Sequence, residues 1–224
     1  MLEVTFPRML KPFVCKDIIR LGKQHDGGYL VNRDDVLKSD MLLSFGVGTD
    51  ISFEEDFNSF KKVRIDAYDN SVEGAFSETG FHRHIQKHVS TVDTDTTANI
   101  ATILEGIPIN TFLKCDIEGG EYDILDDIIR YSYKLTGAVF EFHSLASGQN
   151  LGLLADFMSK LQMRLIHTHI NNYGNYNSPQ GIIPTVIEVS FTSSANVELS
   201  NISLPHELDS PNNPLAPDYK INFM

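Results

Sequence analysis

The sequence lacks the features that mark secreted, membrane-spanning or disulfide-rich proteins. Its 224 residues include only two cysteines, Cys15 and Cys115, which are too few and too far apart for a disulfide framework. No apolar run approaches the roughly 20 residues of a membrane span, and residues 1–3 do not open a signal peptide. We therefore expect free thiols, a cytoplasmic location and no membrane partner.

Positive charge is also scarce. Eighteen lysines and arginines stand against 30 aspartates and glutamates, which gives a net charge of −12. Phosphate backbones are bound by basic patches, so a nucleic-acid partner is not expected. What is present is a globular composition, 42% hydrophobic and 21% charged, over a length that fits a single domain of residues 1–224.

Short apolar runs alternate with helical periodicity along the middle of the chain. Runs typical of buried strands occupy residues 41–46, 63–68, 112–117, 135–142, 163–170 and 185–191, and amphipathic patterns occupy residues 51–61, 96–104, 122–130 and 151–161. This alternation predicts an α/β fold with a mostly parallel sheet and helices on both faces. Because the last two strands have no helix between them, we expect an antiparallel hairpin at one edge.

Local signals set the expected boundaries. Ser52 followed by Glu55 predicts a capping box at the first of these helices, and Asp95 is the expected N-cap of the helix at 96–104. Residues 81–89 fit either a strand or a helix. Four prolines after residue 196 exclude long regular structure there, so residues 196–224 are expected to form an extended arm, and residues 1–40 a lead-in.

A glycine-containing turn points to a nucleoside ligand. Gly46, Gly48 and Thr49 lie between a predicted strand and a predicted helix, where glycines permit a tight turn and close approach of a ligand to the backbone. Asp69 follows Gly46 by 23 positions, at the end of the next strand, where a carboxylate can bind ribose hydroxyls; Asp66 falls in mid-strand. A third glycine is missing, which favours a ligand without pyrophosphate, such as S-adenosylmethionine, over NAD or FAD.

Polar side chains follow three of the later strands. Asp116 and Glu118 are two positions apart, so they project to the same side at the carboxyl end of a strand, where the ligand crevice of an open α/β sheet lies. Paired carboxylates at an apolar strand end need a cation nearby. The ends of the next two strands add further polar residues to the same edge: Glu141, His143, His167, His169, Asn171 and Asn172.

The histidines of this edge have two interpretations. Either His143 or His169 acts as a general base toward a hydroxyl, because histidine titrates near neutral pH. The alternative is a divalent metal held by a mixed oxygen and nitrogen ligand set, namely Asp116, Glu118, His143 and His169. A separate group of three histidines is expected at the surface: His82, His84 and His88.

The segment around Asp116 resembles the signature of a known enzyme family. Lys114-x-Asp116-x-Glu118-Gly119-x-Glu121-x-x-Ile124-Leu125 is similar to the motif of FkbM-type methyltransferases, which are S-adenosylmethionine-dependent O-methyltransferases. Flanking blocks resemble the same group and extend the likeness to residues 18–190: Arg20-Leu21-Gly22, Asp26-Gly27-Gly28-Tyr29, Leu43-Ser44-Phe45-Gly46-Val47-Gly48, His167-x-His169-x-Asn171-Asn172 and Pro184-x-Val186-Ile187-Glu188.

This resemblance implies a Rossmann-like class I methyltransferase sheet and methyl transfer to a hydroxyl of a sugar, glycan or small metabolite. The cofactor is expected between Gly46, Gly48, Thr49, Asp69 and Asp116. Asp116, His143 and His169 are the candidate catalytic residues. Substrate contacts are expected from Glu118, His167, Asn171 and Asn172.

One departure from the family pattern concerns Ser44, which stands where such enzymes often have an acid. Asp116 or a backbone carbonyl is then the expected partner of the cofactor's amino group. Two other functions stay open: a metal-dependent hydrolase that uses Asp116, Glu118, His143 and His169, and a non-catalytic binding module on the same fold. The acceptor, the oligomeric state and the residues around the adenine are not set by the sequence.

Overall fold

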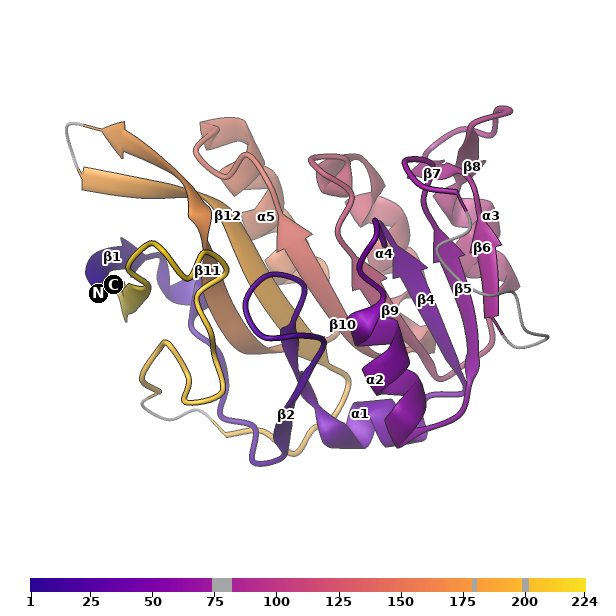
Figure 1. Ribbon diagram of the computed structural model, residues 1–224, viewed down its shortest axis with the longest axis horizontal. Coiled ribbons are helices and arrows are strands. Elements are labelled where there is room, and N and C mark those ends of the chain that lie inside the picture. The colour runs from indigo at the N-terminus through magenta and orange to yellow at the C-terminus, as the bar shows by residue number, and fades with distance from the viewer. Residues whose placement is uncertain (74–81, 179–180, 199–201) are drawn as a thin grey trace.

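Seven strands form one sheet in the order β11-β12-β10-β9-β4-β5-β6 (Figure 1). The computed structural model describes residues 1–73, 82–178, 181–198 and 202–224. In chain order the strands of this sheet are β4 (Met41–Phe45), β5 (Arg64–Tyr68), β6 (His82–Ile85), β9 (Thr111–Cys115), β10 (Leu135–Phe142), β11 (Arg164–Ser178) and β12 (Gly181–Thr192). The predicted α/β fold is confirmed.

The sheet is parallel from β10 to β6, and β12 runs antiparallel to both of its neighbours. The predicted edge hairpin is therefore confirmed as β11 and β12. Its strands are longer than predicted, because the polar residues after Asn172 carry no apolar strand signal and yet continue the pairing with β12 as far as Ser178. The sixth predicted strand thus does not end at residues 167–172.

The three central strands are buried throughout. Every residue of β4, β9 and β10 is buried, which accounts for their nearly continuous apolar sequences. Parallel strands covered on both faces read this way because neither face meets water.

Helices cover the two faces unequally. On one face α3 (Ile100–Gly106), α4 (Leu125–Tyr131) and α5 (Gly148–Lys160) enclose the larger apolar core. On the other, α1 (Arg33–Lys38), α2 (Ser52–Phe60) and the hairpin of β2 (Ile18–Leu21) with β3 (Tyr29–Asn32) enclose a smaller one (Figure 1). Short 3₁₀ turns complete the helices: η1 (Arg8–Leu10), η2 (Glu121–Ile124) and η3 (Ser132–Lys134).

Two further strand pairs lie outside the main sheet. β7 (His88–Ser90) pairs with β8 (Thr97–Asn99), and β1 (Leu2–Phe6) pairs with β13 (Tyr219–Phe223), which brings the two ends of the chain together (Figure 1). Residues 204–218, here called the C-terminal arm, pass over the β11 and β12 side of the sheet before β13. Within the described ranges no helix is long and apolar enough to cross a membrane.

Two predicted helix starts are wrong. Ser52 is already the first residue of α2: its N–H is capped by Asp50 Oδ1, and its own hydroxyl accepts from the backbone of Lys23, so no capping box with Glu55 forms. The helix at 96–104 begins only at Ile100, capped by Asn99, because residues 97–99 pair with β7 instead. The ambiguous segment 81–89 contains strands β6 and β7, with Phe81 outside the described residues.

Candidate functional site

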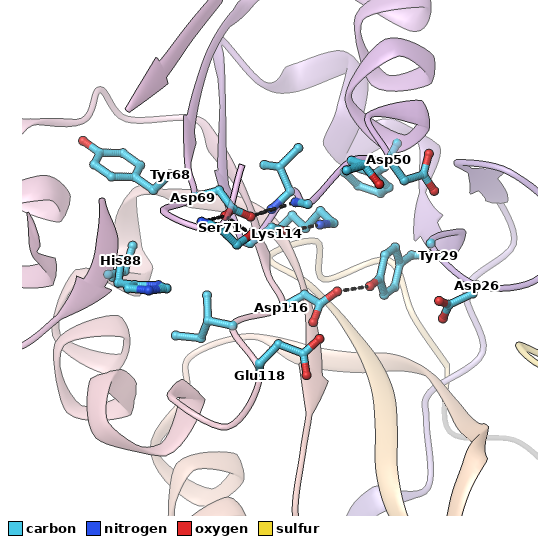
Figure 2. A pocket seen from close by; sticks show the side chains of 18 of the residues that line it. Asp26, Tyr29, Asp50, Tyr68, Asp69, Ser71, His88, Lys114, Asp116 and Glu118 are labelled. Atoms are coloured by element: carbon cyan, nitrogen blue, oxygen red, sulfur yellow. Dashed lines mark hydrogen bonds between the residues drawn. The ribbon is translucent and has the colours of Figure 1, made fainter. Parts of the chain in front are cut away.

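The carboxyl ends of β4, β5 and β9 border a cavity of about 360 Å³ (Figure 2). This is the position at which open α/β sheets bind their ligands. Five carboxylates and two lysines are among its walls, so negative charge predominates and suits a cationic ligand. These charged residues are Lys23, Asp26, Asp50, Asp69, Lys114, Asp116 and Glu118.

The glycine loop, residues 46–49, forms one wall. Gly46 has a φ of +71°, and a Cβ there would overlap the carbonyl oxygen of Asp116, so only glycine fits without a backbone shift. Gly48 has a φ of +58°, but a Cβ there would meet no atom of the described residues within 4 Å. Its open side belongs to the cavity, which Gly46 and Thr49 line as well. The loop therefore exposes bare backbone to a ligand.

Asp69 holds the glycine loop in place. One carboxylate oxygen accepts from the N–H groups of Val47 at 2.8 Å and Gly48 at 2.7 Å, and the other accepts from the N–H and hydroxyl of Ser71, each at 2.6 Å. Burial alone would raise the pKa of Asp69, but these donors outweigh it and lower the pKa to about 2. All four acceptor positions of the carboxylate are filled, so a ribose hydroxyl has to replace one of them.

A buried carboxylate stands in for the acid missing at position 44. Glu54 of α2 is fully buried and accepts a 2.5 Å hydrogen bond from the Ser44 hydroxyl. Lys114 Nζ lies 3.9 Å from the same glutamate oxygen and donates to the carbonyl of Gly46 at 2.6 Å. Among the residues that the structure describes, the second oxygen of Glu54 has no hydrogen-bond partner. The acid thus comes from the helix beneath the loop instead of from the strand.

Asp116 and Glu118 follow β9 at the opposite wall of the cavity, where both line it (Figure 2). The hydroxyl of Tyr29 lies 3.1 Å from one oxygen of Asp116 and 3.1 Å from one oxygen of Glu141. Burial raises the pKa of Asp116 and carries that of Glu141 well above its usual range. The phenol of Tyr29 thus connects Asp116, which lines the cavity, to Glu141, which does not.

His143 joins this pair at the end of β10. Its Nδ1 lies 3.0 Å from the buried carboxylate of Glu121, which also accepts from the N–H groups of Ile117 and Gly119. Its Nε2 is turned toward three other carboxylates, those of Asp116, Glu118 and Glu141. Burial lowers the pKa of His143, but the hydrogen bond and the charge of Glu121 prevail and raise it to about 9.

The structure does not bring His167 and His169 to the cavity. Both are buried in mid-strand on β11, because that strand continues past them. His167 pairs with Asp209 of the C-terminal arm at 3.1 Å, and His169 lies 3.2 Å from Glu188 and 3.4 Å from Asp218. The expectation that these histidines contribute to the site is wrong: neither lines the cavity, and His169 contacts Glu188 and Asp218 and is not part of the group around His143.

The two asparagines predicted beside them are also occupied. Asn171 donates to Glu141 at 2.8 Å, and Asn172 is held by the backbone of Asn213 and Ala216 in the arm. Asn172 therefore fixes the arm, whereas Asn171 supports the carboxylates next to the cavity. Neither lines the cavity.

Together these side chains form what we call the polar layer: Tyr29, Asp116, Glu141, Asn171, Glu188, His169 and Asn212. Cys115 of β9 pairs with Phe140 of β10, so the next residues along, Asp116 and Glu141, lie beside each other. Glu188 of β12 pairs with both Glu141 of β10 and His169 of β11. Asp116, Glu141, Glu188 and His169 therefore form a row across the four strands. Asn212 of the arm donates to Glu188 at 2.6 Å and to Asp26 at 3.2 Å. The arm thus connects the layer to the β2–β3 loop, which lines the cavity.

Several contributors had no sequence signal that identified them. In the sequence, Glu54 is only one residue of a predicted helix, Lys114 only one residue of a motif, and Asn212 lies in a proline-rich tail. The turn before Tyr29 does line the cavity through Asp26 and Gly27. His88, expected only at the surface, lines the cavity as well, and His84 contacts the backbone of Asp69.

Comparisons with known proteins identify the family. A family model described as the methyltransferase FkbM domain matches residues 25–175. A comparison with curated proteins gave no match. Similar solved structures include the fibrillarin pre-rRNA processing protein of Methanococcus jannaschii, with 7% identity and a TM-score of 0.47 over 70% of this chain and 68% of that one. Another is a putative sarcosine dimethylglycine methyltransferase from Galdieria sulphuraria, with 10% identity and a TM-score of 0.45 over 72% and 81%.

Likenesses this weak say nothing about a substrate. The family match is different in kind, because it covers more than half of the chain and contains the glycine loop, Asp69 and the Asp116 segment. The earlier resemblance is thereby confirmed. The chain belongs to the FkbM methyltransferase family, and the protein is a methyltransferase with a class I α/β fold.

Proposed function

We propose that this methyltransferase carries a methyl group from S-adenosylmethionine to a hydroxyl of an uncharged sugar, glycan or small metabolite. One observation carries the proposal: the glycine loop, Asp69 and the two carboxylates after β9 border a single acidic cavity. A nucleoside site and an acid-lined acceptor site are thus adjacent, as methyl transfer from a bound donor requires.

The cavity fits the donor in charge and shape. When bound, S-adenosylmethionine supplies a methyl group on a cationic sulfur, and the excess of carboxylates over lysines suits that charge. The open side of Gly48 leaves room for a ligand against the backbone. Tyr68 and Val89 offer apolar surface to an adenine ring, and Asp69 offers acceptors to ribose once one of its present donors is released.

Asp116 is the residue suited to take the proton of the acceptor hydroxyl. The hydroxyl oxygen forms a bond to the methyl carbon as the carbon–sulfur bond breaks, and the hydroxyl proton has to leave. Burial raises the pKa of Asp116, which makes it a better base than an ordinary aspartate. With no cation bound beside it, His143 carries a proton at neutral pH because its pKa is about 9, so it then holds the carboxylates and does not accept the proton.

The walls of the cavity also favour one class of acceptor. Asp26, Asp50 and Glu118 line the cavity together with Asp116, and both of its lysines are engaged: Lys23 is paired with Asp50 at 2.9 Å, and Lys114 donates to the carbonyl of Gly46 at 2.6 Å. Phosphorylated or carboxylated acceptors would be repelled there. A neutral polyol, whose hydroxyls donate to carboxylates, suits this lining.

The test has two parts. Calorimetric titration with S-adenosylhomocysteine should give a one-site isotherm, and incubation of the protein with the labelled donor and a panel of neutral sugars should transfer label to at least one. Absence of binding, or transfer only to nitrogen or to anionic acceptors, would falsify the proposal. The family match gives the hydrolase alternative no support, and one of its four predicted residues, His169, contacts Glu188 and Asp218 instead of Asp116.

A further inference from the structure

We infer that Asp116, Glu118 and His143 form a binding site for one divalent transition-metal ion beside the cofactor cavity. One oxygen of each acid and one nitrogen of the histidine lie within 4.8 Å of one another. The inference concerns ion binding in its own right. Only the part that we give the ion in catalysis rests on the proposed function.

The spacing of these atoms suits an ion better than direct hydrogen bonds. His143 Nε2 lies 3.5 Å from Glu118 Oε2 and 4.0 Å from Asp116 Oδ1, and among the described residues no hydrogen-bond acceptor is paired with it. These separations exceed normal hydrogen bonds. An ion with bonds of about 2.1 Å sets its ligands ~3.0 Å apart at right angles and ~4.2 Å apart across it. The observed values fall in that range.

The two half-buried ligands, Asp116 and His143, are each oriented by a second side chain. Glu121, which is fully buried, holds His143 Nδ1 at 3.0 Å and thereby directs Nε2 toward the acids. Tyr29 contacts Asp116 Oδ2 and so leaves Oδ1, the oxygen nearer to the imidazole, available. In proteins, a metal-binding histidine is typically hydrogen-bonded to a carboxylate through its other nitrogen, and a metal-binding carboxylate is hydrogen-bonded in turn.

Charge and access favour the same conclusion. Asp116, Glu118, Glu121 and Glu141 surround one histidine, an excess of negative charge that a divalent ion offsets. The side chain of Glu118 is 87% exposed, which gives an ion a path from solvent. A set of one imidazole and two carboxylates favours Mn²⁺ or a similar ion over Mg²⁺, which prefers oxygen ligands and keeps its waters.

In catalysis the ion would act on the acceptor. Asp116 and Glu118 line both the proposed metal site and the cavity, so an acceptor hydroxyl in the cavity is within reach of the ion. A bound ion lowers the pKa of such a hydroxyl and stabilises the charge on its oxygen. The hydroxyl proton then leaves to water, while the oxygens of Asp116 serve as ligands and not as the base.

The experiment is an electron paramagnetic resonance titration of the whole chain with Mn²⁺, in which the signal of free Mn²⁺ falls as the ion binds. We expect one ion per chain, at least tenfold weaker binding in Glu118→Gln and in His143→Asn, and unchanged binding in Asp126→Asn. Asp126 is the matched control, because it is an exposed acid of the adjacent α4 and the substitution removes the same charge.

The outcomes separate the two proposals. If Mn²⁺ does not bind at millimolar concentration, or if Glu118→Gln and Asp126→Asn bind it equally, the metal site is wrong. If the chain fails to bind Mn²⁺ but still binds S-adenosylhomocysteine, the proposed function stands, with Asp116 as the base. If the chain binds Mn²⁺ but its rate of methyl transfer is unchanged after a chelator removes the ion, only the proposed catalytic role of the ion is wrong.

Discussion

Two carboxylate centres lie on opposite sides of the same cavity, and they are built in opposite ways. Asp69 is surrounded by donors: four hydrogen bonds from the loop and from Ser71 saturate its oxygens, and its pKa falls to about 2. The polar layer has three carboxylates and four donor side chains, so each carboxylate has fewer donors than Asp69. Asp116 and Glu141 share one phenol, and burial raises the pKa of both.

The two centres also differ in the range of chain that they join. Asp69 contacts residues no more than 22 positions away, whereas Tyr29 is 87 positions from Asp116 and 112 from Glu141. The Asp69 centre is a rigid support for a ligand and carries a fixed charge. The polar layer holds charges that respond to whatever cation or proton enters, which is what a reaction at a hydroxyl requires.

The largest effect is expected from the glycine loop. Gly46→Ala should lower the free energy of unfolding by about 3–5 kcal/mol, because the new Cβ adds a backbone overlap at Asp116 to the strain of a positive φ. Gly48→Ala should cost only the strain, about 1–2 kcal/mol, since in the described part of the chain nothing lies within 4 Å of its Cβ. Urea unfolding followed by circular dichroism measures both.

Gly48→Ala should nevertheless weaken S-adenosylhomocysteine binding at least tenfold, because its methyl group would project into the cavity. Comparing Gly46→Ala with Gly48→Ala therefore distinguishes a glycine that the fold requires from one that ligand binding requires. Equal losses of stability in the two variants, or full ligand affinity in Gly48→Ala, would contradict this view of the loop.

The next effect concerns the charge of His169, which lies between Glu188, Asp218 and Asp209 with His167 alongside. Burial lowers the pKa of His169, but its ionic interactions with Asp218 and Glu188 raise it to about 10, above an unfolded value near 6.5. Because the pKa of His169 is higher in the folded state than in the unfolded state, the protonated imidazole stabilises the fold. This contribution is complete below pH 6.5 and is lost as the pH rises through 10.

His169→Gln should therefore cost about 3 kcal/mol of unfolding free energy at pH 6, and the cost should shrink steadily between pH 6.5 and 10. Urea unfolding at pH 6, 8 and 9.5 measures the trend. His88→Gln is the control, since His88 is exposed and its replacement should change stability by less than about 0.5 kcal/mol. A cost that stays constant with pH would show that His169 stabilises by packing and not by charge.

Much of the Asp69 centre could be predicted from the sequence. A strand, a Gly-x-Gly turn, a helix, a second strand and an acid follow one another within 29 residues, and each has a local signal. Even there, the sequence does not predict that the carboxylate of Asp69 holds the glycine loop in place. The role of Glu54 was missed because a buried glutamate on a helix has the same sequence pattern as an exposed one.

The polar layer could not be predicted to the same extent, because tertiary contacts alone assemble it. The placement of Asp116 and Glu118 could be predicted, because side chains two positions apart on a strand project to the same side. His169 was misplaced because the end of β11 depends on its pairing with β12, and the arm residue Asn212 lies in a segment without periodicity. Local patterns predict where a strand runs, but not which distant segment covers it.

Asp69 itself gives the third prediction. Asp69→Ala removes the acceptor of the Val47 and Gly48 N–H groups, so S-adenosylhomocysteine affinity should fall by about tenfold to thirtyfold and stability by about 2 kcal/mol. Asp66→Asn is the matched control on the same strand, since Asp66 is buried against Arg64 and Arg83 and does not line the cavity. Its ligand affinity, measured by calorimetry, should stay within twofold of the parent. Equal losses in the two variants would refute a specific role for Asp69.

The smallest and most selective effect is expected for Tyr29→Phe. The ring keeps its edge contact with Phe53, so the fold should be retained, but Asp116 and Glu141 lose the hydroxyl that orients them. If the polar layer positions the groups that act on the acceptor, kcat should fall about tenfold while S-adenosylhomocysteine affinity changes less than twofold, because the contacts of Asp69 are untouched. Tyr133→Phe, at an exposed tyrosine, should leave both unchanged. A loss of cofactor affinity equal to the loss of kcat would mean that the two centres are not separate, and that Tyr29 shapes the whole cavity instead of the acceptor side alone.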